Sequence, residues 1–155
     1  MNVVQQQRIS EIQRLFEENL DLFDRKNPLM VKIKAKGISK VVATLPLINH
    51  PKYSATILNI SETLDDDGEI TSYHYGWELS QEVEKLSKQR RHITAFGNED
   101  HSGPPMFEKD QYHHHHIPYD PAKRQHTNVK NLETVIEILK KYIVEGKIYD
   151  QSHLF

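Results

Sequence analysis

The sequence predicts an α+β protein in which a curved, mostly antiparallel sheet of five or six strands is flanked by an N-terminal and a C-terminal helix. Apolar residues repeat at helical spacing near the two ends of the chain, and the segment between them alternates as strands do. The 155 residues are 37% hydrophobic and 27% charged, enough for one core and too apolar for a disordered protein. We expect a single domain over residues 1–155.

The first helix is expected over residues 5–24. Its apolar side chains recur at spacings of three and four: Ile9, Ile12, Phe16, Leu20 and Phe23. Asn27-Pro28 ends the pattern, because a residue before proline avoids the α region.

The middle of the chain contains six strand-like runs. In order they are Val31–Ala35, Ser39–Ile48, Tyr53–Leu64, Glu69–Leu79, Arg91–Phe96 and Gln111–Tyr119. Lys36-Gly37 and Asp65–Gly68 are typical of turns, because glycine and aspartate tolerate positive φ. Residues 80–89 are polar and suit one or two helical turns, residues 97–110 suit a loop, and Asp120-Pro121 is expected to break the last strand.

The last helix is expected on an apolar stripe that runs from Val129 to Ile143. Thr127 or Asn128 could cap its start, and Gly146 stands where a left-handed C-terminal residue is expected. A sheet covered by two such helices buries one face and leaves the other available for a site.

Composition and charge narrow the class of function. The net charge of −2 argues against a protein that coats nucleic acid through bulk electrostatics, although an enzyme could still bind a few phosphates locally. The chain has no cysteine, no apolar signal peptide and no apolar stretch that could span a membrane. We therefore expect a cytoplasmic protein without membrane association.

Ten residues are histidines, and five of them lie between His101 and His116. On a strand, His113 and His115 would share one face, and His114 and His116 the other. Two imidazoles suit metal-independent cleavage of RNA, in which one takes the proton of a 2′-hydroxyl and the other protonates the leaving 5′-oxygen. The same spacing suits a metal ion equally well, so the sequence leaves both chemistries open.

A second candidate segment precedes the histidine run. Asn98 could bind a phosphate or orient His101, although asparagine also commonly holds a loop. Arg91 and Arg124 flank the two segments and are candidate phosphate ligands. For cleavage, both segments must meet around one scissile linkage.

The strand Glu69–Leu79 contributes aromatic residues. Tyr73 and Tyr75 could stack on bases, but their alternation with Leu79 favours a place in the core. His74 then points to the opposite face and is a candidate substrate-binding residue.

These motifs resemble a known family. The Tyr73-x-Tyr75 strand, Phe96-x-Asn98-x-x-His101, and His113-His114-x-His116 followed by Ile117 are similar to the TumE-type toxins of toxin–antitoxin pairs, over roughly residues 53–143. The resemblance implies a small cytoplasmic ribonuclease encoded beside a helix-turn-helix antitoxin. Carried onto this chain, its motif positions are Asn98, His101, His113, His114 and His116.

This chain departs from the family pattern at Ala95 and Gly97, where members often carry charged residues, and in the Gly103-Pro104-Pro105 loop. A divergent member could instead degrade small cyclic oligoadenylates by the same chemistry. A histidine-ligated metalloprotein and a non-catalytic binding module are the alternatives outside nuclease chemistry. The ribonuclease hypothesis requires no cofactor, and the sequence leaves the oligomeric state open, a homodimer included.

Overall fold

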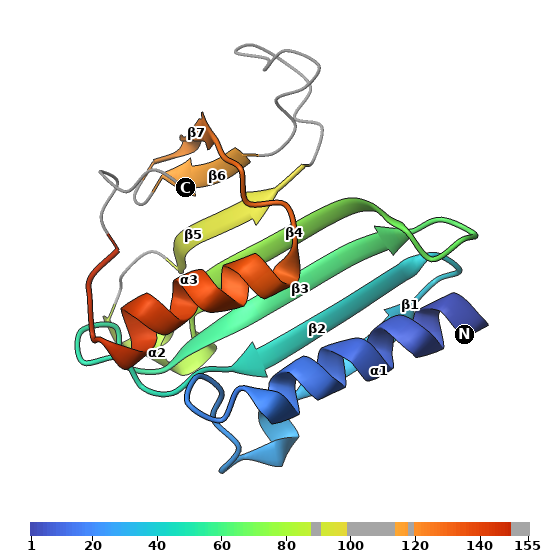
Figure 1. The fold of residues 1–155 in the computed structure, drawn as a ribbon. Helices are drawn as coiled ribbons and strands as arrows, with labels where there is room; N and C mark the ends of the chain where they lie inside the picture. The colour runs from blue at the N-terminus through green and yellow to red at the C-terminus, as the bar shows by residue number, and fades with distance from the viewer. Residues whose placement is uncertain (88–90, 99–113, 118–119, 150–155) are drawn as a thin grey trace.

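The computed structural model describes residues 1–87, 91–98, 114–117 and 120–149, with the backbone alone described at 87, 114–117 and 120–126. Along the chain the elements are α1 (Val3–Glu18), the 3-10 turn η1 (Pro28–Met30), β1 (Lys32–Lys36), β2 (Lys40–Pro46), β3 (Thr56–Leu64), β4 (Ile70–Leu79), α2 (Gln81–Ser87), β5 (His92–Gly97), β6 (His114–Ile117), β7 (Asp120–His126) and α3 (Leu132–Val144). Figure 1 shows them as one twisted sheet with helices packed on it.

The strands form one sheet whose spatial order, β1 to β7, follows the order of the chain. Every neighbouring pair is antiparallel, so the predicted α+β class is confirmed. The sequence did not predict β7, because Asp120-Pro121 was interpreted as a break. Proline is tolerated there because β7 is the last strand of the sheet among the described residues, where a missing N–H does not interrupt a ladder on both sides.

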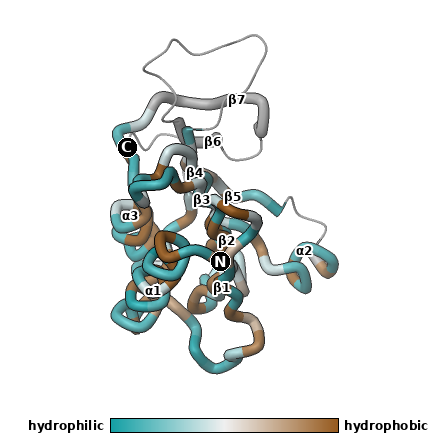
Figure 2. The backbone as a smooth tube through the Cα atoms, turned by 90° about the vertical axis from the view of Figure 1, so that its right-hand side faces the viewer, coloured by the Kyte–Doolittle hydropathy of each residue, from teal (hydrophilic) through white to brown (hydrophobic). Residues whose placement is uncertain are grey.

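Both long helices cover the same face of the sheet, whereas α2 lies on the other side (Figure 2). The core between helices and sheet contains large, fully buried side chains, among them Trp77, Tyr75, Tyr142 and Phe23. The alternation of β4 explains this placement, because Tyr73, Tyr75 and Trp77 all point to the helix-covered face.

The ends of the two helices differ from the prediction. The helix α1 ends at Glu18 rather than near residue 24, because the Asn19 side chain and backbone N–H both donate to the carbonyl of Leu15 and close the last turn. The helix α3 is capped by Asn131, whose Oδ1 accepts from the backbone N–H of Thr134 at 2.8 Å. Thr127 instead accepts from Val129 in the preceding turn. The described helices are all too short or too polar to cross a lipid bilayer.

A buried ion pair holds α1 on the sheet. Arg8 donates from Nε and Nη2 to the two carboxylate oxygens of Glu62 on β3, at 2.7 and 2.8 Å, and Glu62 also accepts from the Tyr75 hydroxyl at 2.8 Å. Burial alone would lower the pKa of Arg8, but its bonds and proximity to Glu62 raise it overall. Arg8 is therefore held as a cation inside the core.

Candidate functional site

The face of the sheet opposite α1 and α3, here called the distal face, carries a group of polar residues. On β4 the alternation that sends Tyr73, Tyr75 and Trp77 into the core directs His74, Gly76 and Glu78 to the distal face. Glu78 lies at the end of β4 that leads directly into α2.

Glu78 is the centre of a hydrogen-bond network that runs across four strands. Its side chain is only 6% exposed. Its Oε2 accepts from Asn59 Nδ2 at 2.5 Å and from Arg91 Nε at 2.9 Å, and its Oε1 lies 3.2 Å from Nδ1 of His92. Asn59 in turn accepts from Thr44 Oγ1 at 2.9 Å. These five residues form the distal-face network.

The network holds an imidazole and a guanidinium at the surface. The His92 side chain is 63% exposed and the Arg91 side chain 38% exposed. Because a carboxylate can only accept, the contact with Glu78 places the hydrogen of His92 on Nδ1 and leaves Nε2 for other partners. An imidazole oriented in this way can accept a proton, and the adjacent guanidinium can bind an anion.

Gly76 provides space for His74 and Glu78 to approach each other on β4. A Cβ at position 76 would lie 3.2 Å from Glu78 Oε1 and 3.3 Å from His74 Nε2. Both side chains therefore extend over the glycine, which links His74 to the distal-face network.

The backbone register brings the histidine strand into line with His74, at the end of β5 opposite to His92. His74 pairs with Gly97, Gly97 with His114, and His114 with His126, so these positions form one line across β4 to β7. With adjacent strands about 4.8 Å apart, the backbones at His74 and His114 are separated by about 10 Å. Phe96 and Gly97, which precede Asn98, are therefore paired with His115 and His114 of the histidine strand.

The structure also describes the backbones of two other predicted site residues, His116 and Arg124. His116 on β6 pairs with Arg124 on β7, so His116 lies on the strand next to β5 and Arg124 lies one strand further from it. His101 and His113 lie outside the described residues.

Asn98 is engaged with β4. Its Oδ1 accepts from the backbone N–H of Tyr73 at 2.8 Å, and its Nδ2 donates to the carbonyl of Thr71 at 3.1 Å. The side chain thus fastens the end of β5 to β4, as the loop-holding interpretation expects.

The proposed stacking role of Tyr73 and Tyr75 is corrected by the structure. Both are buried, at 3% and 0% exposure, and stack on each other with ring centroids 4.9 Å apart. Burial raises the pKa of Tyr73 to about 12, and burial together with Glu62 raises the pKa of Tyr75 further. The core interpretation of these residues is the right one.

Sequence reasoning missed Glu78, His92 and Asn59 as site residues. Alternation already placed Glu78 beside His74, and that shared face was the available signal. The role of Asn59 depends on the pairing of β3 with β4, which the sequence does not reveal. No group of three or more His, Cys, Asp or Glu in the described parts of the chain is arranged to hold a metal ion.

A family model described as Toxin TumE matches residues 6–147, which is most of the chain. The chain belongs to the TumE toxin family. The match confirms the resemblance and extends it to α1 and the first strands. Membership of this toxin–antitoxin family implies that the chain has an antitoxin as its partner. No curated protein and no solved structure gives a significant match to the chain.

Proposed function

We propose that this TumE toxin is a metal-independent ribonuclease that cleaves RNA by attack of a 2′-hydroxyl on the adjacent phosphorus. The observation that carries the proposal is the exposed imidazole of His92. It is oriented by the buried Glu78 and lies next to Arg91, on the distal face to which His74 of β4 also points. The backbone pairing of β5 with β6 puts the histidine strand next to β5, which is where further histidines of the chain occur in sequence.

The reaction assigns a role to each group. The Nε2 of His92 takes the proton of the 2′-hydroxyl, and the 2′-oxygen then bonds to phosphorus. The P–O bond to the 5′-oxygen breaks, and a second, protonated imidazole gives that oxygen its proton. The products are a 2′,3′-cyclic phosphate and a 5′-hydroxyl.

The remaining groups support this transfer. Glu78 fixes the orientation of His92, because its Oε1 lies 3.2 Å from Nδ1 of the imidazole. Arg91 binds the phosphate through the donors that it does not use on Glu78. The second imidazole comes from His74 or from the set His101, His113, His114 and His116.

The experiment uses purified, antitoxin-free toxin in EDTA with a 5′-labelled RNA and, separately, a cyclic oligoadenylate. We expect cleavage of the RNA with a 2′,3′-cyclic phosphate end. His92→Ala should slow it by roughly a hundred- to ten-thousandfold, since each proton transfer contributes about that much. Glu78→Gln and Arg91→Ala should also slow it.

Arg14→Ala is the matched control for Arg91→Ala, because Arg14 is exposed on α1, on the other side of the sheet. It should cleave at the wild-type rate. If the RNA stays intact with stoichiometric toxin, the ribonuclease proposal is refuted. If only the cyclic oligoadenylate is cleaved, the substrate class is cyclic oligoadenylates rather than linear RNA. Wild-type cleavage by His92→Ala would remove His92 from the mechanism.

A further inference from the structure

The strand β1 forms one edge of the sheet, with β2 as its neighbour on one side only in the described chain. Its sequence Lys32–Lys36 alternates, so that Lys32, Lys34 and Lys36 are exposed on the distal face. Ile33 and Ala35 point to the other face and are only partly buried. An edge strand of this kind presents unpaired backbone groups to a partner.

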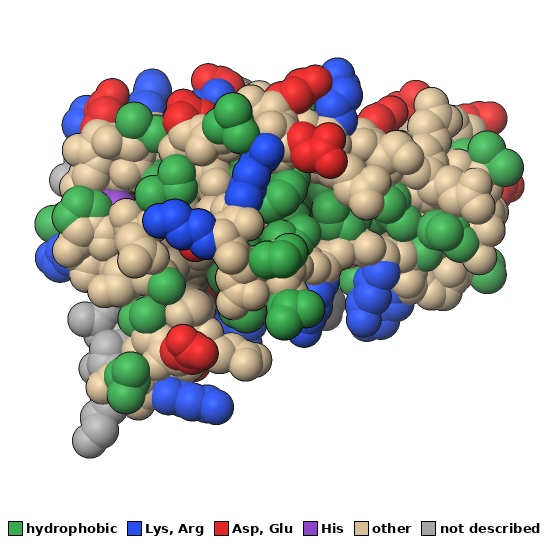
Figure 3. Space-filling view, turned by 90° about the horizontal axis from the view of Figure 1, so that it is seen from below, with side chains coloured by type: hydrophobic (Ala, Val, Ile, Leu, Met, Phe, Trp, Pro, Cys, Tyr) green, Lys and Arg blue, Asp and Glu red, His purple; other side chains and the backbone are tan. Residues whose placement is uncertain are grey.

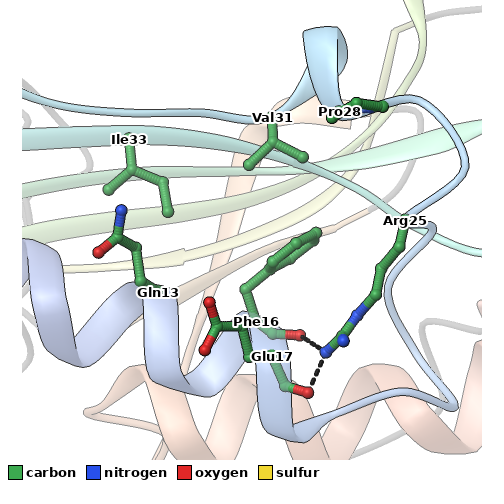
Figure 4. Close-up of a pocket in the computed structure, with 7 residues that line it drawn as sticks. All are labelled: Gln13, Phe16, Glu17, Arg25, Pro28, Val31 and Ile33. Atoms are coloured by element: carbon green, nitrogen blue, oxygen red, sulfur yellow. Dashed lines mark hydrogen bonds between the residues drawn. The ribbon is translucent and has the colours of Figure 1, made fainter.

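An apolar hollow adjoins this edge on the helix side. It has a volume of about 480 Å³ and lies between the last turns of α1, the following loop and β1 (Figure 4). Its lining residues are Gln13, Phe16, Glu17, Arg25, Pro28, Val31 and Ile33. The guanidinium of Arg25 sits 5.5 Å from the centre of the Phe16 ring and donates to the carbonyls of Phe16 and Glu17, which fixes one wall.

The apolar character extends beyond the hollow. Leu29 and Met30 of η1 are 86% and 42% exposed, immediately before β1. Figure 3 views the molecule from the side on which α1 and β1 lie, and shows apolar side chains gathered in the middle of that face with basic and acidic side chains around them.

The edge is held in place before any partner arrives. The Asn2 side chain donates to the carbonyl of Ile38 at 2.8 Å, and Gln5 donates to the carbonyls of Gly37 and Lys40 at 3.0 and 2.9 Å. These bonds fasten the β1–β2 turn to α1. A preformed edge lowers the conformational cost of adding a strand.

We propose that β1 is the docking site of the antitoxin, which adds to the sheet an extended segment with alternating apolar and acidic side chains. The apolar side chains enter the hollow beside Phe16, Val31 and Ile33, and the acidic ones face Lys32, Lys34 and Lys36. Main-chain hydrogen bonds then provide affinity, and the two rows of side chains provide specificity.

Charge favours the antitoxin segment over two other possible occupants of this edge, a second copy of the chain and RNA. A second copy pairing through β1 would place its lysines against Lys32, Lys34 and Lys36, and like charges opposite each other destabilise a strand pair. RNA would use the lysines but neither the backbone edge nor the apolar hollow. Only a strand with acidic residues on one face and apolar residues on the other uses all three features.

The test measures binding of the purified cognate antitoxin to the full-length toxin. The triple variant Lys32→Glu, Lys34→Glu, Lys36→Glu should raise the Kd at least about tenfold, a change of about 1.4 kcal/mol. Val31→Thr, which keeps the shape of the hollow but makes it polar, should also weaken binding. Hydrogen exchange should show the amides of β1 protected in the complex.

Matched variants provide the controls. Lys52→Glu, Lys130→Glu, Lys141→Glu changes the net charge equally at exposed positions away from β1, and Val144→Thr adds a hydroxyl at an exposed position on α3. Both should bind the antitoxin as wild type does. The proposal would be overturned if the β1 variants bound the antitoxin with unchanged affinity or if the β1 amides stayed unprotected in the complex. It would also be overturned if the toxin formed a dimer through β1, or if the β1 variants lost RNA binding but bound the antitoxin normally. Because the readout is binding, its failure leaves the ribonuclease proposal intact.

Discussion

At the scale of single residues, Glu78 determines how the distal-face network is arranged. Its buried carboxylate accepts from Asn59 on β3 and Arg91 before β5, and it also contacts His92. A buried carboxylate is retained only when such donors compensate its lost hydration. Removing it would leave an amide and a guanidinium without their partner and would release His92 from a fixed orientation.

Gly76→Ala tests whether the spacing of His74 and Glu78 matters. The new Cβ would lie 3.2 and 3.3 Å from the ends of these side chains, so both must shift by a few tenths of an ångström. We expect RNA cleavage to fall by about tenfold, because catalytic groups are sensitive to small displacements. The free energy of unfolding should change by less than about 1 kcal/mol, because a glycine in a strand interior is itself unfavourable. Equal cleavage by Gly76→Ala and wild type would show that this spacing has no role.

Three buried tyrosines with raised pKa values, Tyr73, Tyr75 and Tyr149, make stability depend on alkaline pH. Burial raises the pKa of Tyr73 and of Tyr149 from 10.0 to about 12. Above pH 10 the unfolded chain loses these protons while the folded chain keeps them, so the free energy of unfolding falls by about 1.4 kcal/mol per pH unit per tyrosine up to about pH 12. Urea denaturation at pH 9, 10 and 11 measures this slope.

Two variants test which tyrosines cause the fall in the free energy of unfolding at alkaline pH. Tyr73→Phe and Tyr149→Phe should each make the fall between pH 10 and 11 shallower, whatever their stability at pH 8. A slope that neither variant changes would contradict the assignment.

Alternation along β4 was enough to predict from the sequence which of its residues enter the core and which reach the distal face. It could not predict the contacts that depend on pairing between strands. Asn98 illustrates this, because its amide binds the backbone at Thr71 and Tyr73, 25 or more residues away. His92 is a second example, since its contact with Glu78 can be recognised only when β4 and β5 are paired.

At the scale of elements, the attachment of α1 depends on Arg8 and Glu62. Arg8→Ala should lower the free energy of unfolding by about 3–5 kcal/mol, because it leaves a buried carboxylate without its cation. Glu11→Ala is the control: Glu11 also contacts Arg8 but its side chain is 42% exposed, so the change should stay below about 1 kcal/mol.

A double variant separates the charge from the packing. Arg8→Met with Glu62→Gln removes both charges and keeps an acceptor for the Tyr75 hydroxyl. It should recover more than half of the loss in urea denaturation, since apolar replacement of a buried pair is often close to neutral. A loss for Arg8→Ala no larger than that for Glu11→Ala would mean that the ion pair does not hold the helix.

Most elements were predictable because each has a local signal, such as the helical stripe of α3 or the Asp65–Gly68 turn. The errors arose where a local cap or the position of a strand in the sheet overrides the apparent pattern of the sequence. The helix α1 stops at Asn19 through a local cap although the apolar spacing continues to Phe23, whose backbone pairs instead with Leu47. The strand β7 tolerates Pro121 because of its place as the last strand of the sheet among the described residues, which only the topology reveals.

At the scale of the whole molecule, two surfaces of different chemistry lie on the distal face of the sheet. The lysines of β1 occupy one edge, and the charged groups of the distal-face network that are proposed to contact RNA, Arg91 and His92, lie at β5. Four strand spacings of about 4.8 Å place β1 about 19 Å from β5. This distance exceeds the screening length of about 8–10 Å in physiological salt, so the two surfaces should act independently.

The salt dependence of cleavage tests this separation. With a net charge of −2, the toxin should contact only about one to three phosphates, and each contact contributes about −0.7 to the slope of log kcat/KM against log salt for a single strand. Between 50 and 400 mM KCl we expect a slope of about −0.7 to −2. Arg91→Ala should make it shallower by about 0.7, whereas reversing the charges of Lys32, Lys34 and Lys36 should leave it unchanged. A slope steeper than about −4, or one that depends on the β1 lysines, would mean that RNA crosses the whole distal face and that the two surfaces are one.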